Sequence, residues 1–103
     1  MSRLDSNSLH RLKAHAQVLK ALAHPTRLYL VETLAGGEKC VCELTERVGA
    51  DISTVSKHLA LLKKAGIVAD EKRGAMVFYS LRTPCALRFF QCIESVQQAS
   101  AES

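Results

Sequence analysis

The sequence predicts one mainly α-helical domain with a small β-hairpin near its C-terminal end. Apolar residues recur at intervals of three and four along most of the chain, which is the period of an amphipathic helix. After Gly66 the period changes to two, which is typical of strands. The 103 residues match the usual size of a single domain, so we expect one domain over 1–103, with disordered ends at about 1–6 and 99–103.

The composition favours a soluble chain with a polyanionic partner. Hydrophobic residues make up 48% of the sequence, and the formal net charge is +4 with a pI near 9.0. No apolar run approaches the roughly 20 residues that cross a bilayer, and the N-terminus lacks a signal-peptide core. We therefore expect a cytoplasmic protein with no membrane partner, whose four cysteines are reduced rather than disulfide-bonded.

Three helices are expected before residue 50. The first covers residues 7–23, with one apolar face made of Leu9, Leu12, Ala16, Leu19 and Ala23. Its two histidines, His10 and His15, are interpreted as surface residues, with metal ligation as the alternative. The second runs from Pro25 to about Ala35, and the third from Val41 to Val48. The turn at Gly49 then leads into a further helix, which is the helix-turn-helix pattern.

The helix over residues 51–66 is predicted to read DNA. Asp51 is suited to cap its start, and Val55, Leu59 and Leu62 form one buried stripe. Hydroxyl groups and cations near a helix start suit phosphates and base edges. The candidate DNA-binding residues are Ser53, Thr54, Ser56, Lys57 and His58. The alternative is an ordinary solvated amphipathic helix.

A hairpin and a last helix complete the chain. The hairpin is expected to pair residues 67–69 with 76–81 around a charged turn at 70–74. Arg73 at its tip could reach phosphate or a minor groove, or could be a solvated turn charge. The last helix is expected from Thr83–Pro84 to about Gln98. Because the first and last helices both carry apolar faces that a small core cannot cover, they predict a homodimer.

Four segments of the chain match a known pattern: L-A-H-P-T-R-L-Y-L-V-E-T-L (22–34), K-C-V-C-E-L (39–44), T-V-S-K-H-L-A-L-L-K-K-A-G-I-V (54–68) and K-R-G-A-M-V-F-Y-S-L (72–81). Together they resemble the ArsR/SmtB family of metal-responsive winged-helix repressors, in its arsenic-sensing branch. The resemblance implies the order α-α-α-α-β-β-α, a homodimer through the first and last helices, and binding to double-stranded operator DNA that an inducer ends. Many relatives carry Gln where this chain has Ile52, so base reading would fall more on the neighbouring polar residues.

Cys40 and Cys42 resemble the C-V-C-[DE]-L box of the branch that senses arsenic and cadmium. Residues i and i+2 point to nearly opposite sides of a regular helix, so two such thiols share an ion only where the backbone is distorted. Thiolates select soft ions, and a helix start favours the thiolate form. The arsenic branch often has a third Cys where this chain has Thr45. Cys85 or Cys92, from either chain of a dimer, could complete the site, or either could be a small buried hydrophobic residue.

These observations predict a repressor that arsenite, antimonite or another soft thiophilic ion releases from its operator, with no organic cofactor. One alternative is a thiol redox or persulfide-responsive repressor on the same fold, and another is a cadmium- or lead-responsive repressor. Zinc or nickel sensing on the last helix is not expected, because suitably placed Asp and His are lacking there. An enzyme is not expected either, because C-x-C differs from the redox C-x-x-C and no phosphate loop or nucleophile elbow is present.

Overall fold

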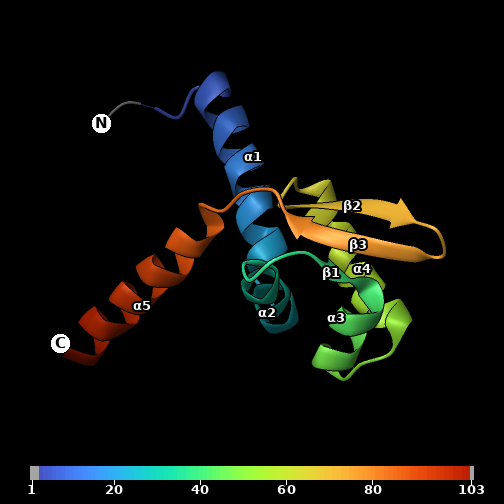
Figure 1. Ribbon diagram of the computed structural model, residues 1–103. Helices are drawn as coiled ribbons and strands as arrows, with labels where there is room; N and C mark the ends of the chain where they lie inside the picture. The colour runs from blue at the N-terminus through green and yellow to red at the C-terminus, as the bar shows by residue number, and fades with distance from the viewer. Residues whose placement is uncertain (1–2, 103) are drawn as a thin grey trace.

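The computed structural model describes residues 3–102 and contains helices and strands in the predicted winged-helix order, with one additional strand (Figure 1). None of the helices in this part of the chain is long and apolar enough to span a membrane. The elements are α1 (Ser6–Leu22), α2 (Pro25–Leu34), β1 (Lys39–Cys40), α3 (Val41–Val48), α4 (Ile52–Lys64), β2 (Val68–Arg73), β3 (Met76–Leu81) and α5 (Ala86–Glu102).

The core lies where α2, α3 and α4 pack against one another and against the sheet. The predicted stripe of α4 is confirmed, since Val55, Leu59 and Leu62 have no exposed surface. On α2 the fully buried residues are Leu30 and Val31, with Leu34 nearly so, whereas Leu28 is only half-buried. These three helices therefore form the rigid body from which the other elements project.

The helix-turn-helix is formed by α3 and α4. Gly49 ends α3 with φ 76°, a left-handed conformation that costs glycine little. The Asp51 carboxylate then caps α4 by accepting a 2.8 Å hydrogen bond from the Thr54 amide. The short turn thus fixes α4 relative to α3, as the sequence predicts.

The sheet has three antiparallel strands in the order β1-β3-β2. The two-residue strand β1 was not predicted; it pairs Lys39 with Tyr79 and Cys40 with Phe78. The predicted turn at residues 70–74 is wrong, because β2 continues to Arg73 and only Gly74 and Ala75 lie between the strands. The charged residues from Asp70 to Arg73 are exposed strand residues, so no alternation of apolar side chains marks this strand in the sequence.

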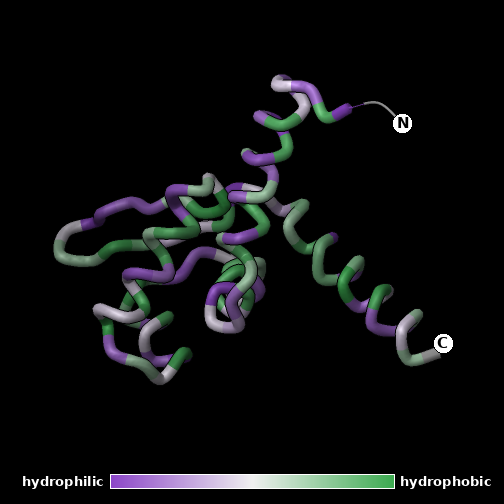
Figure 2. The backbone as a smooth tube through the Cα atoms, turned by 180° about the vertical axis from the view of Figure 1, so that it is seen from behind, coloured by the Kyte–Doolittle hydropathy of each residue, from purple (hydrophilic) through white to green (hydrophobic). Residues whose placement is uncertain are grey.

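Helices α1 and α5 extend away from this body, as Figure 1 shows. On α1, Leu9, Leu12 and Leu19 are 39–53% exposed, and on α5, Phe89, Ile93 and Val96 are 41–61% exposed. Figure 2 shows the hydrophobic stretches along α5, which projects free of the rest of the chain. Among residues 3–102 nothing covers either face, which is the arrangement expected of helices that meet a second copy.

Two helix boundaries differ from the prediction. Helix α5 begins at Ala86 rather than at Thr83–Pro84, and Ala86 is buried in the core. Helix α5 also continues through Glu102, so residues 99–102 are helical. Among the expected disordered ends, residues 1–2 and 103 lie outside the described residues, and Ser6 already begins α1. The single-domain assignment stays a prediction.

Candidate DNA-contact surface and cysteine site

The first turns of α4 expose a polar surface that surrounds one large apolar side chain. Ser53, Thr54 and Lys57 are exposed, and Ser56 is half-buried. The Asp51 carboxylate accepts hydrogen bonds from Thr54, whose amide nitrogen lies 2.8 Å away, and from the Ser53 hydroxyl at 3.3 Å; the bonds from Thr54 are the main cause that lowers the pKa of Asp51. Ile52 lies beside these residues and is 56% exposed. The surface can therefore donate hydrogen bonds and make one apolar contact.

His58 occupies a different position from the other four predicted residues of α4. It is half-buried and faces α2, where its ring lies 4.4 Å from the ring of His24. The Arg27 Nη1 atom lies 3.1 Å from His58 Nδ1. Because a guanidinium only donates, His58 Nδ1 accepts and carries no proton in this contact. Burial, followed by the charges of His24 and Arg27, lowers the pKa of His58.

Sequence reasoning overlooked Arg27, which joins α1, α2 and α4. Its Nε donates to the Ala21 carbonyl at 2.5 Å, while Nη1 reaches His58 on α4. His58 carried a usable signal, because residues 55, 58, 59 and 62 together have the spacing of one buried helix face. The spacing alone therefore indicates that His58 lies beside the buried face of α4, and the structure adds its contacts with Arg27 and His24.

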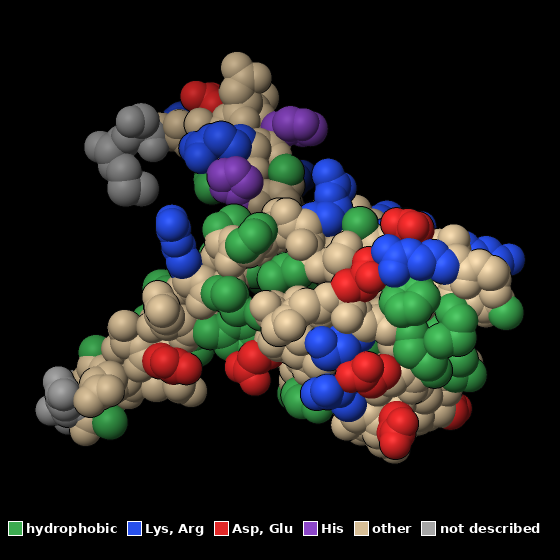
Figure 3. Space-filling view, in the orientation of Figure 1, with side chains coloured by type: hydrophobic (Ala, Val, Ile, Leu, Met, Phe, Trp, Pro, Cys, Tyr) green, Lys and Arg blue, Asp and Glu red, His purple; other side chains and the backbone are tan. Residues whose placement is uncertain are grey.

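Arg73 lies at the end of β2 and is bound by two carboxylates. Its Nη1 and Nη2 atoms donate to the two oxygens of Glu38 at 2.6 and 2.8 Å, and its Nε donates to Glu71 at 3.0 Å. The hydrogen bonds that Arg73 donates to Glu71 and then to Glu38 raise the pKa of Arg73 further above its already high ordinary value. In Figure 3 acidic and basic side chains are intermixed over the hairpin, rather than forming one basic surface.

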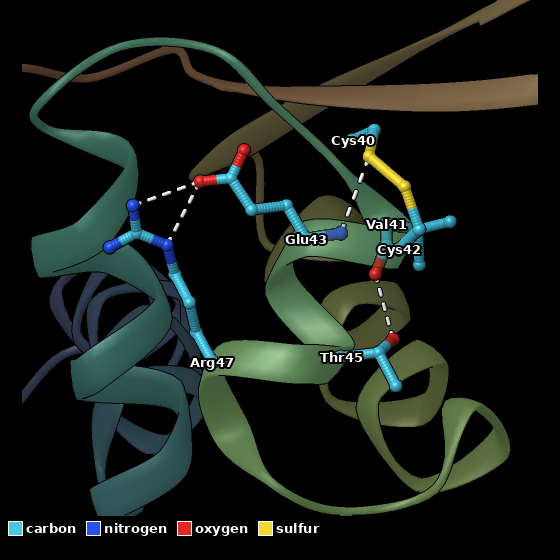
Figure 4. Close-up of a disulfide and its surroundings, with 6 residues drawn as sticks. All are labelled: Cys40, Val41, Cys42, Glu43, Thr45 and Arg47. Atoms are coloured by element: carbon cyan, nitrogen blue, oxygen red, sulfur yellow. Dashed lines mark hydrogen bonds and ion pairs between the residues drawn. A yellow bond between two sulfur atoms is a disulfide. The ribbon is translucent and has the colours of Figure 1, made fainter.

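Cys40 and Cys42 meet where β1 passes into α3, and a disulfide joins them (Figure 4). The expectation of four reduced cysteines is wrong for this pair. Cys40 is the N-cap of α3 with an extended backbone, φ −76° and ψ 157°, and its Cα atom lies 5.3 Å from that of Cys42. This irregular helix start is what the sequence analysis required before residues i and i+2 could act together.

Hydrogen bonds around Cys40 and Cys42 explain why the regular helix α3 begins directly after Cys40. The Cys40 sulfur accepts a 3.3 Å hydrogen bond from the Glu43 amide, which caps α3. The Thr45 hydroxyl, at the position where the arsenic branch often has Cys, donates to the Val41 carbonyl at 2.7 Å. Glu43 also forms an ion pair with Arg47 at 2.9 Å. Cys40 is buried and Cys42 is exposed, so a reagent reaches the pair from the Cys42 side.

The structure does not bring Cys85 or Cys92 to this pair within one chain. Both are free and exposed, with Cys85 in the turn before α5 and Cys92 within α5. The interpretation of these two as buried hydrophobic residues is therefore wrong for the single chain. Between residues 3 and 102, no three side chains of His, Cys, Asp or Glu come together as a metal site. Two sulfurs from Cys40 and Cys42, once reduced, fit a soft ion as part of its ligand set.

The paired helices α3 and α4, followed directly by a hairpin, define a winged helix-turn-helix domain. The family described as "Bacterial regulatory protein, arsR family" matches residues 24–70. A biofilm growth-associated repressor of Xylella fastidiosa is 36% identical over 96 residues, which are 93% of this chain and 82% of that protein. A cadmium resistance transcriptional regulatory protein CadC homolog of Staphylococcus aureus is 42% identical over 64% of this chain and 55% of its own length.

Solved structures agree with these sequence matches. A homodimeric winged helix-turn-helix DNA-binding domain of Mycobacterium bovis superposes with a TM-score of 0.79 at 28% identity, covering 99% of this chain and 94% of that one. The chain belongs to the arsR family of bacterial regulatory proteins, and it is a DNA-binding transcriptional repressor of that family. The family and fold are those of DNA-binding regulators rather than enzymes.

Proposed function

We propose that the protein is a homodimeric repressor whose operator affinity falls when arsenite or antimonite binds Cys40 and Cys42. The observation that carries the inducer assignment is the meeting of the two sulfurs at the start of α3, the first helix of the helix-turn-helix. Trivalent arsenic and antimony are thiophilic, and two thiolates at this spacing chelate one ion. The third position is left for Cys85 or Cys92 of the partner chain, or for solvent.

The DNA contacts in this proposal come from α4 and the hairpin. The first turns of α4 enter the major groove, with Ser53, Thr54, Ser56 and Lys57 against bases and phosphates. His58 stays against Arg27 and orients the helix. The exposed apolar faces of α1 and α5 support pairing of two chains, as does the homodimeric solved relative. Two recognition helices then dock in half-sites about 34 Å apart.

Inducer binding would act through the position of α3. Cys40 caps α3, and α3 is joined to α4 by the short turn at Gly49. An ion held by both sulfurs alters the start of α3, and α4 moves with it because the two helices pack together. The two recognition helices of a dimer then lose their spacing. The ion must bind the DNA-free form better, by a coupling of about 1–3 kcal/mol.

A thiol redox response is the second candidate, and the disulfide itself favours it. Two thiols form one disulfide by losing two electrons and two protons, which a peroxide or polysulfide oxidant accepts. The exposed Cys42 offers the route of attack, and the buried Cys40 then completes the bond. This version needs no third ligand. The CadC homolog among the relatives keeps cadmium as a further candidate inducer.

Fluorescence anisotropy with duplex DNA from upstream of the protein's own gene tests both versions. Reduced protein is titrated with arsenite, antimonite, cadmium or lead, and in a separate arm with polysulfide or peroxide. We expect arsenite and antimonite to weaken binding about 5- to 150-fold. The variants Cys40→Ser and Cys42→Ser should lose the response. Cys85→Ser and Cys92→Ser are matched controls that should keep it if solvent fills the third position.

The outcomes separate the candidates. Loss of the metal response in Cys85→Ser or Cys92→Ser identifies the third ligand. If the four ions have no effect while oxidant releases wild-type protein but not Cys40→Ser, the redox version holds. If neither ions nor oxidant change DNA affinity, Cys40 and Cys42 are not the sensor. A protein that sediments as a monomer at micromolar concentration contradicts the dimer.

A further inference from the structure

Arg73 carries a charge arrangement that opposes DNA binding as the structure stands. Its guanidinium meets both oxygens of Glu38 and one oxygen of Glu71. Two carboxylates against one guanidinium give this group of three side chains a net charge of −1, so Arg73 offers no free positive charge to a phosphate. Because a phosphate and a carboxylate bind the same face of a guanidinium in the same forked geometry, only one of them can occupy it.

The ion pair with Glu38 is well formed but remains accessible to solvent. The two Glu38 contacts are 2.6 and 2.8 Å, and the Arg73 and Glu38 side chains are 44% and 38% exposed. Exposed pairs of this kind contribute little net stability, so the partner of Arg73 can change at small cost.

The same ion pair is connected to the cysteine site through the sheet. Glu38 precedes Cys40 by two residues, and Cys40 pairs with Phe78 in the register of β1 and β3. The Arg73 guanidinium lies 4.7 Å from the centre of the Phe78 ring. Glu38 is thus linked to Arg73 in two ways. One is the direct ion pair, and the other runs along the chain to Cys40, across the strand pair to Phe78, and from the Phe78 ring to Arg73.

We propose that Glu38 and a DNA phosphate compete for Arg73, and that the disulfide between Cys40 and Cys42 holds Arg73 on Glu38. Glu38 is a positioning residue in this scheme, and Arg73 is the group that touches DNA. The inference rests on the proposed function, because it presumes that the hairpin lies against operator DNA. It adds a second route from the cysteines to DNA, through β1 and the hairpin rather than through α3 and α4.

The proposal assigns a direction to the switch. In the structure Cys40 and Cys42 form a disulfide and Arg73 is bound to Glu38. The disulfide form is therefore the form in which the guanidinium of Arg73 is not available to DNA. Opening the disulfide frees the start of α3 and the end of β1 to shift. Glu38 directly precedes β1 and shifts with that strand, whereas Arg73 stays on β2. The two hydrogen bonds between Arg73 and Glu38 are then lost, and Arg73 becomes available to a DNA phosphate.

The test measures DNA affinity and its salt dependence for Glu38→Gln, Arg73→Gln and the double variant, each in the reduced and the disulfide form. Thiol titration verifies the redox state. Glu32→Gln is the matched control, since Glu32 is an exposed carboxylate of α2 and the change removes the same charge. In the disulfide form we expect Glu38→Gln to bind roughly two- to fivefold tighter than wild type. Its plot of log affinity against log salt should steepen by about 0.9 per subunit.

Each remaining outcome decides one part of the proposal. The gain from Glu38→Gln should vanish when Arg73→Gln is also present, and Glu32→Gln should leave the salt slope unchanged. Weaker binding by Glu38→Gln, an unchanged slope, or the same gain without Arg73 overturns the competition. An equal gain in both redox forms overturns the link to the cysteines. If reduced wild-type protein binds no upstream duplex at all, the proposed function fails instead.

Discussion

The exposed Ile52 gives the sharpest prediction about operator sequence. Ile52 is the first residue of α4 and is 56% exposed among hydroxyl-bearing neighbours. The first residues of a recognition helix meet base edges, and the apolar group available on those edges is the thymine methyl. Burying one methyl group contributes about 0.8 kcal/mol, or about a fourfold change in affinity per half-site. Two half-sites give about 1.6 kcal/mol, or roughly fifteenfold.

Replacing operator thymines one at a time with deoxyuridine measures this contact, because deoxyuridine lacks only the methyl group. One symmetric pair of positions should weaken wild-type binding by the amount above, and the same duplex should not weaken Ile52→Ala further. Leu61→Ala, which trims an apolar residue 48% exposed on the far half of α4, is the control and should respond like wild type. Ile52→Gln should shift the preference at that position toward adenine. Deoxyuridine that is tolerated everywhere, or that costs Ile52→Ala as much as wild type, refutes the contact.

Three further predictions concern stability, pH and ligand removal. Leu59→Ala, which empties a fully buried site, should lower the free energy of unfolding by about 3–4 kcal/mol, whereas Leu61→Ala should cost under about 1 kcal/mol in urea titrations at matched protein concentration. Because burial first and neighbouring charges second lower the pKa of His58, the folded chain binds fewer protons than the unfolded chain. Stability should therefore fall as pH drops below 6.5, and His58→Asn should flatten that loss in unfolding curves from pH 7.5 to 5. Adding a competing dithiol to the arsenite-bound protein should restore operator anisotropy, and persistent release would contradict reversible binding at Cys40 and Cys42.

The elements that sequence reasoning located correctly are those whose signals are local. Helix α4 has a capping Asp51, a stripe of three buried residues and a closing glycine at Gly66, whose φ is 84°. Asp51 lies directly at the start of α4 and Gly66 lies within one turn of its end, so each boundary is marked by a residue beside it. Strand β1 is different, because two residues carry no period and its existence depends on β3 almost forty residues away. Long-range pairing of so short a segment has no local signature.

Among the candidate site residues too, local features could be predicted from the sequence and long-range contacts could not. The exposure of Ser53, Thr54 and Lys57 follows from their place on the helix, and the sequence was sufficient to indicate it. The partners of Arg73 could not be predicted, because Glu38 is 35 residues away and reaches it only through the sheet. A charge seen in a sequence is a possible contact, but whether it is already neutralised is decided by tertiary structure.

The spacing of Cys40 and Cys42 is matched to the junction between β1 and α3. A regular helix would hold residues i and i+2 apart, and the chain resolves this by ending β1 at Cys40 and using the same residue to cap α3. Cys40 therefore belongs to the strand that contacts the hairpin and to the helix that precedes α4. Any reaction that joins its sulfur to that of Cys42 constrains both elements at once. If the proposed function is correct, a change at these two sulfurs reaches α4 through α3 and reaches the hairpin through β1, and neither route passes through the buried core.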